Sequence, residues 1–103
     1  MPTKPKTVEV VVYRVGKPAR VEAIPDTLAA QQAIVGGDIK DCILDHLTVI
    51  YGAEAADTGQ PPNRQVGRIF VLGNFFICRT DEEGCTAPLT KKDRAFLKKN
   101  YAL

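Results

Sequence analysis

The sequence predicts a single α+β domain: a mostly antiparallel sheet of five or six strands, one short helix after the first hairpin, and a C-terminal helix. Three observations support this fold class. Short β-rich runs recur at hairpin spacing, one helix-forming run ends at a double glycine, and the chain closes with an amphipathic basic run. A chain of 103 residues has room for one such core. We expect residues 1–7 to form a flexible tail and residues 8–103 to form the domain.

The chain is predicted to open with a β-hairpin and a helix. Residues 8–14 are β-branched nearly throughout, and residues 20–24 alternate polar and apolar side chains as a returning strand would. Residues 28–35 are good helix formers that end at Gly36 and Gly37, and a double glycine suits a helix C-cap. The spacing predicts a helix of about eight residues that contacts the sheet through a narrow apolar stripe.

Two more hairpins are predicted in the middle of the chain. Residues 39–44 and 47–51 are strand-like and flank a tight turn, and residues 52–59 indicate a loop bounded by glycines. Residues 68–72 and 75–80 are predicted as strands joined at Gly73-Asn74, a two-residue hairpin signal. The alternative for Gly73 is a bulge within one long strand.

The last predicted element is a helix over residues 91–101. Thr90 is the expected N-cap, and Asp93 occupies the N3 position that a capping box would give to Glu or Gln. The helix is predicted to be amphipathic. Its core side chains are Phe96, Leu97, Tyr101 and Leu103, and the opposite face carries Lys91, Arg94 and Lys98.

Charge and composition limit the function classes. Fourteen Lys and Arg oppose twelve Asp and Glu, for a net charge of +2, which lacks the strong bias of a dedicated nucleic-acid binder. Residues 91–103 nevertheless carry a net +4, so the preceding ninety residues sum to −2. No apolar run approaches the roughly 18 residues of a membrane span, and no apolar segment follows the N-terminal charges. We expect a cytoplasmic protein that does not contact a membrane.

The residue types that catalysis or metal binding requires are scarce in this chain. The chain has no serine and one histidine, His46, so an activated nucleophile beside a base is not indicated, and no phosphate-binding glycine motif is present. Cys42, Cys78 and Cys85 are an odd set typical of a reducing compartment. With His46 they lack the tight Cys-x2-Cys spacing of zinc sites, so we interpret them as packing residues. We expect no enzyme activity, no cofactor and no metal.

The rigid segment of residues 61–64 is the candidate binding site. Two prolines stiffen the chain ahead of Asn63 and Arg64, and Arg68 follows shortly after. One interpretation is structural: Asn63 caps a turn, and Arg64 pairs with Asp57 or another acid to hold the loop on the sheet. The other interpretation places Asn63, Arg64 and Arg68 on the rim of a binding surface.

Three motifs at this spacing resemble a known family. They are the helix, double glycine and strand of residues 28–39, the sequence Pro61-Pro62-Asn63-Arg64, and Gly73-Asn74-Phe75. Together they resemble a family of small uncharacterised proteins carried by phages, plasmids and other mobile elements of bacteria, over about residues 8–80. The chain departs from the family in its longer loop at residues 52–59 and in Asp38, where many members have an aromatic residue.

The resemblance implies no chemistry, since the family has no assigned activity. It implies a small accessory protein that binds a host protein, for instance to inhibit a defence system such as a CRISPR effector. The alternative is a weak nucleic-acid-binding module on the C-terminal helix, where Lys91, Arg94 and Lys98 would follow phosphates. Three to five phosphate contacts give a slope of log affinity against log salt of roughly −3 to −4.5 on duplex DNA.

Overall fold

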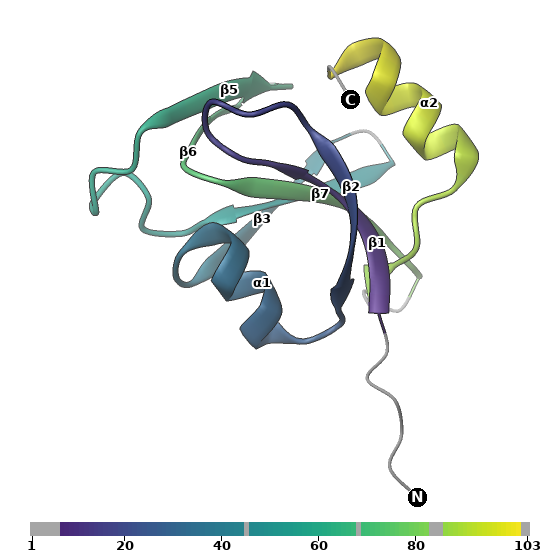
Figure 1. Cartoon of the computed structure of the whole chain (residues 1–103), viewed down its shortest axis with the longest axis horizontal. Helices are drawn as coiled ribbons and strands as arrows, with labels where there is room; N and C mark the ends of the chain where they lie inside the picture. Colours follow the sequence, from purple (N-terminus) through teal and green to yellow (C-terminus); the bar gives the residue numbers. More distant parts are fainter. Residues whose placement is uncertain (1–6, 45, 68, 83–85, 102–103) are drawn as a thin grey trace, which may run out of the picture.

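The computed structural model, which describes residues 7–44, 46–67, 69–82 and 86–101, confirms the predicted α+β domain (Figure 1). Within these ranges, ten helices and strands follow one another. They are β1 (Thr7–Tyr13), β2 (Arg20–Pro25), α1 (Leu28–Val35), β3 (Ile39–Leu44), β4 (Leu47–Gly52), β5 (Pro62–Val66), β6 (Ile69–Leu72), β7 (Phe75–Thr80), β8 (Thr86–Ala87) and α2 (Lys91–Asn100).

The main sheet has six strands, and all of its pairs are antiparallel. Its order is β2-β1-β7-β4-β3, and the short strand β8 pairs with the far end of β7. Strand β7 therefore lies at the centre of the sheet, between β1 and β4. Strands β5 and β6 form a separate two-stranded sheet.

The main sheet is buried on both faces, because its central strands carry apolar side chains at odd and even positions. Val10 and Val12 of β1 share one face with Phe76 of β7, and this face packs against Val35 of α1. The opposite face carries the second apolar cluster, which reaches Leu97 of α2 and also includes side chains of β5 and β6. Figure 1 shows the result: α1 and α2 lie on opposite sides of the sheet.

Both helices begin and end as their sequences predict. The Thr27 side chain caps the start of α1, and Gly36 ends it in the left-handed conformation (φ 86°) with its N–H donating to the Gln32 carbonyl. At α2, the Thr90 hydroxyl accepts from the Asp93 N–H, and the Asp93 carboxylate accepts from the Thr90 N–H. These two bonds are the predicted capping box.

Two predictions for residues 61–80 are wrong. Residues 62–66 form strand β5 rather than a loop, and β6 pairs with β5 rather than with β7. A hairpin between β6 and β7 is excluded because β1 and β4 already occupy both edges of β7. Gly73, at φ 75°, carries the chain from one sheet to the other, and its N–H donates to the Pro61 carbonyl at 2.7 Å.

Several predictions concern residues outside the described ranges. These are residues 1–6 of the predicted tail, and Asp45, Arg68, Cys85 and Leu103. The seventh residue of that tail, Thr7, is wrongly assigned, since it begins β1. Within the described ranges, neither helix has the length and apolar character that crossing a membrane requires.

Candidate functional site

Asn63, the first candidate binding residue, is a structural residue that joins three strands. Its side-chain amide donates two hydrogen bonds of 2.9 Å, one to the Tyr13 carbonyl at the end of β1 and one to the Gly73 carbonyl between β6 and β7. Its Oδ1 accepts from the Nε of Arg64 at 3.2 Å. Because both amide protons are used, Asn63 holds β5 against the main sheet and has no donor left for a ligand.

Arg64 is fixed in the same network. Its guanidinium lies over the ring of Tyr13, 4.8 Å from the centroid, and one nitrogen donates to the Lys17 carbonyl at 3.3 Å. The expected pairing with Asp57 or another acid is wrong, since within the described ranges Arg64 contacts no carboxylate. Arg64 instead fastens β5 to the turn between β1 and β2 through a carbonyl and an aromatic face.

Tyr13 is the buried centre of this network. Its ring stacks in parallel on Phe75, with the centroids 4.7 Å apart, and its side chain is fully buried. Burial raises the pKa of Tyr13 to about 12, although the nearby Arg64 charge opposes the rise. Of the three candidate binding residues, Asn63 and Arg64 therefore belong to the scaffold, and Arg68 lies outside the described residues.

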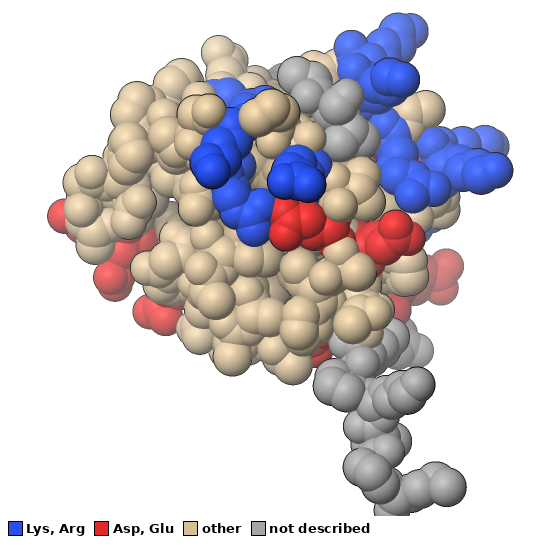
Figure 2. All heavy atoms as spheres, viewed as in Figure 1, with Lys and Arg blue, Asp and Glu red and all other residues tan. Residues whose placement is uncertain are grey.

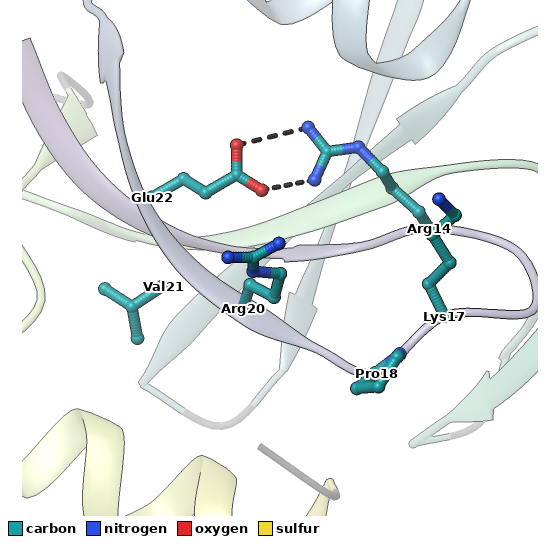
Figure 3. Close-up of a pocket in the computed structure, with 6 residues that line it drawn as sticks. All are labelled: Arg14, Lys17, Pro18, Arg20, Val21 and Glu22. Carbon is teal, nitrogen blue, oxygen red and sulfur yellow. Dashed lines mark hydrogen bonds and ion pairs between the residues drawn. The ribbon is translucent and has the colours of Figure 1, made fainter.

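A basic hollow lies beside these residues, at the tip of the β1–β2 hairpin (Figure 3). Arg14, Lys17 and Arg20 line a cavity of about 490 Å³ around one carboxylate, Glu22. Arg14 binds Glu22 through both terminal guanidinium nitrogens, and this hydrogen bonding lowers the pKa of Glu22. From the sequence these residues were predicted only to belong to the first hairpin. Their convergence depends on the hairpin register, which pairs Val12 with Arg20.

The basic face of α2 is only partly available for a ligand. Lys91 and Lys98 are exposed, as predicted. Arg94 lies 3.6 Å from the Glu9 carboxylate of β1, so this cation pairs with the sheet. Figure 2 shows basic side chains over α2 and a second basic group over the β1–β2 turn, both on the face turned toward the viewer.

Asp93 connects α2 to the sheet through a polar cluster in which the Asp93 carboxylate is buried and its partners His46 and Arg79 are partly exposed. Its side chain is 1% exposed; its Oδ1 lies 2.9 Å from His46 Nε2 between β3 and β4, and Arg79 of β7 donates at 3.1 Å to Oδ2. Burial pushes the pKa of Asp93 upward, but hydrogen bonds from Thr90, Arg79 and His46 outweigh it and lower the pKa. The capping-box pattern located Asp93, whereas nothing local indicated His46 or Arg79.

An apolar hollow of about 270 Å³ lies along the free edge of β3. Its lining comes from β3, β4 and the β5–β6 hairpin: Cys42, Ile43, Leu44, Val49, Val66, Gly67 and Ile69. Ile43 is 80% exposed at this edge, and Phe70 is 61% exposed on β6. The strands predicted over residues 39–44, 47–51 and 68–72 include most of these positions but not Val66 and Gly67, and the pattern did not mark Ile43 or Phe70 as exposed.

Among the described residues, Cys42, Cys78 and His46 do not come together as a metal-binding cluster. Cys42 pairs with Val49 and Cys78 with Thr48, so the two thiols lie on opposite faces of the sheet. Burial raises the pKa of Cys78 to about 12, which keeps this thiol protonated. Among the residues that the structure describes, no group of three or more His, Cys, Asp or Glu side chains is placed to hold a metal. Cys85 lies outside them.

These features define a small α+β domain. Asn63 and Arg64 hold its β5–β6 hairpin against the main sheet, the β1–β2 tip is basic, and the β3 edge is apolar. The chain belongs to DUF3846, a family described as a domain of unknown function, whose model matches residues 7–102. The comparisons found no matching curated protein and no matching solved structure.

Proposed function

We propose that this protein is a non-enzymatic binding module that docks an extended segment of a host protein onto the free edge of β3. The observation that carries the proposal is the exposed Ile43 at this edge, beside the apolar hollow. Edge strands expose unpaired backbone N–H and C=O groups, and an added strand satisfies them while alternate side chains fill neighbouring pockets.

Charge divides this edge into two halves. Lys40 and Asp41 protect the first half, since charged side chains on an edge discourage pairing with other chains. The second half, Cys42 to Leu44, carries no charge, and it borders the hollow. Side chains alternate along a strand, so an added segment would place one residue toward the hollow and the next beside Ile43.

The partner class follows from chemistry and from the resemblance. Apolar side chains at a strand edge are recognised by an extended apolar peptide rather than by a nucleic acid or a small polar metabolite. Because the motifs resemble those of small proteins of bacterial mobile elements, the partner that we propose is a host protein, and the proposed role is inhibition of a defence system such as a CRISPR effector. The chain needs neither a cofactor nor a metal for this role.

The test is a pull-down from bacterial host lysate with the tagged full chain and two variants. Ile43→Lys introduces a charge on the proposed edge. Leu28→Lys is the matched control, because Leu28 is also an exposed apolar residue but lies on α1. We expect a stoichiometric protein that the wild type and Leu28→Lys retain and Ile43→Lys loses, and the purified partner should reproduce this pattern.

Two results would overturn the proposal. One is equal retention of every partner by Ile43→Lys and the wild type. The other is a wild-type dimer in light scattering that Ile43→Lys dissociates, because the edge would then serve a second copy of this chain. Circular dichroism of both variants shows whether each remains folded.

A further inference from the structure

The basic side chains are concentrated on two neighbouring parts of one face. Nine of the fourteen lysines and arginines lie at the β1–β2 tip, on Arg64 beside it, or on α2: Arg14, Lys17, Arg20, Arg64, Lys91, Lys92, Arg94, Lys98 and Lys99. Figure 2 shows the two basic groups on one face, with a few acidic side chains directly below them and others at the left of the view. The net charge of +2 therefore hides a strongly basic face.

Only part of this charge is neutralised within the protein. Arg14 pairs with Glu22, Arg94 pairs with Glu9, and Arg64 is held by carbonyl and aromatic contacts. Within the described ranges no carboxylate forms an ion pair with Lys17 or Arg20, and both are exposed. Figure 3 shows these two side chains beside the Arg14–Glu22 pair, at the rim of the cavity. The β1–β2 tip thus presents cations that the fold itself does not use.

We propose that the β1–β2 tip and α2 together form a binding face for the phosphate backbone of double-stranded nucleic acid. Lys17 and Arg20 supply one group of phosphate contacts, and the exposed lysines of α2 supply the other. This inference concerns a different surface from the β3 edge and does not depend on the proposed protein partner.

The chemistry of the face favours nucleic acid over an acidic protein. Five of the nine cations are lysines, and lysine is depleted at protein–protein interfaces but is a common phosphate contact. The face also favours a duplex over a single strand. Single-strand binders stack bases on exposed aromatic rings, whereas Phe96 and Tyr101 of this region are partly buried in the core. Contacts to the backbone alone carry no base information, so binding is independent of sequence.

The salt dependence of binding distinguishes a face formed by both basic groups from binding by α2 alone. Three to five contacts from α2 give a slope of log affinity against log salt of roughly −3 to −4.5. Two further contacts from Lys17 and Arg20 steepen the slope by about 1.8, because each duplex phosphate contact contributes about 0.9. The contribution of the β1–β2 tip is therefore measurable as a difference in slope.

The experiment measures fluorescence anisotropy of a labelled mixed-sequence DNA duplex, and of one of its single strands, across a salt series. The variants are Lys17→Ala/Arg20→Ala and Lys98→Ala/Lys99→Ala. Lys40→Ala is the matched control, since Lys40 is an exposed lysine on β3 at the far edge of the sheet. We expect both double variants to bind more weakly with a slope shallower by about 1.8, and Lys40→Ala to match the wild type.

Each contrary outcome overturns the inference. An unchanged slope in Lys17→Ala/Arg20→Ala would show that α2 acts without the hairpin tip. Tighter binding of the single strand than of the duplex would contradict backbone recognition of a duplex. If no variant binds the duplex even at low salt, the basic face serves an acidic protein or no ligand. Ile43→Lys is predicted to bind the duplex like the wild type, so failure here and failure of the protein-partner proposal are separable.

Discussion

Removal of the Asp93 carboxylate is predicted to weaken the attachment of α2 to the sheet and so to lower the free energy of unfolding. In Asp93→Ala, the Thr90 N–H loses its acceptor at the start of α2, and His46 and Arg79 lose the anion between them. The carboxylate is 1% exposed, so few water molecules can replace it without a local rearrangement. The variant therefore loses one of the two capping-box hydrogen bonds and the ionic contact with His46 and Arg79 in a single substitution.

The expected cost follows from adding these two contributions. Loss of an N-terminal cap costs about 1 kcal/mol. Hydrogen bonds to a charged group contribute about 1.5–3 kcal/mol. Arg79 and His46 are both more than a third exposed, so water can partly solvate them in the variant, and the lower end of that range applies. We therefore expect the free energy of unfolding to fall by about 2.5 kcal/mol.

Urea unfolding followed by circular dichroism measures this loss. Thr90→Ala removes only the cap hydroxyl and should cost about 1 kcal/mol. Asp57→Asn is the matched control, because Asp57 is an exposed aspartate in the loop after β4, and it should change stability by less than about 0.5 kcal/mol. A loss below about 1 kcal/mol in Asp93→Ala would refute the assignment of Asp93 as the link between α2 and the sheet.

The same carboxylate predicts how stability depends on pH. The fold lowers the pKa of Asp93, so ionisation of this group stabilises the folded state at every pH above its unfolded value, about 3.9. This stabilisation is lost as the pH falls through the pKa that Asp93 has in the folded state, which is lower than its pKa in the unfolded state. The difference in unfolding free energy between the wild type and Asp93→Asn should therefore narrow below about pH 4. A constant difference down to lower pH would show that charge at Asp93 is not what stabilises the fold.

Three further substitutions test the scaffold by urea unfolding. Asn63→Asp should destabilise the protein more than Asn63→Ala, because a carboxylate would face the two carbonyls that the amide now binds; the reverse order would contradict this network. Phe76→Ala should cost about 3–5 kcal/mol, since the ring is fully buried against α1, and a loss under about 1 kcal/mol would contradict that burial. Gly73→Ala should cost about 1–2 kcal/mol, because φ is positive and a new Cβ would lie 3.2 Å from the Gln60 Cβ; wild-type stability would show that this junction adapts.

The parts of the fold that were predictable are those that local chemistry determines. The end of α1 followed from the double glycine, and the N-cap of α2 followed from Thr90 with Asp93 three residues later. The first strand was found because β-branched residues fill both of its faces. In each case a few neighbouring residues specify the structure, without information from the rest of the chain.

Strand pairing was not predictable in the same way, because it depends on which edges other strands leave open. Gly73-Asn74 has the composition of a hairpin turn, yet β6 cannot pair with β7, whose two edges are occupied by β1 and β4. Pro62 concealed β5, since a proline is tolerated in a strand only where its missing N–H has no partner to bind, as at an edge. These outcomes follow from competition between distant segments.

The candidate surfaces depend on the same long-range arrangement. The sequence analysis assigned excess positive charge to α2 alone, because only there do basic residues follow one another closely. Lys17 and Arg20 are more than seventy residues away from α2 along the chain, and the preceding ninety residues have a net negative charge. Folding of the β1–β2 hairpin and docking of α2 on the sheet place both groups on one side, whereas acids such as Glu54 and Asp57 follow β4. The net charge therefore understates the positive potential over the β1–β2 tip and α2. Association with a phosphate backbone depends on where the charges lie in space rather than on their sum.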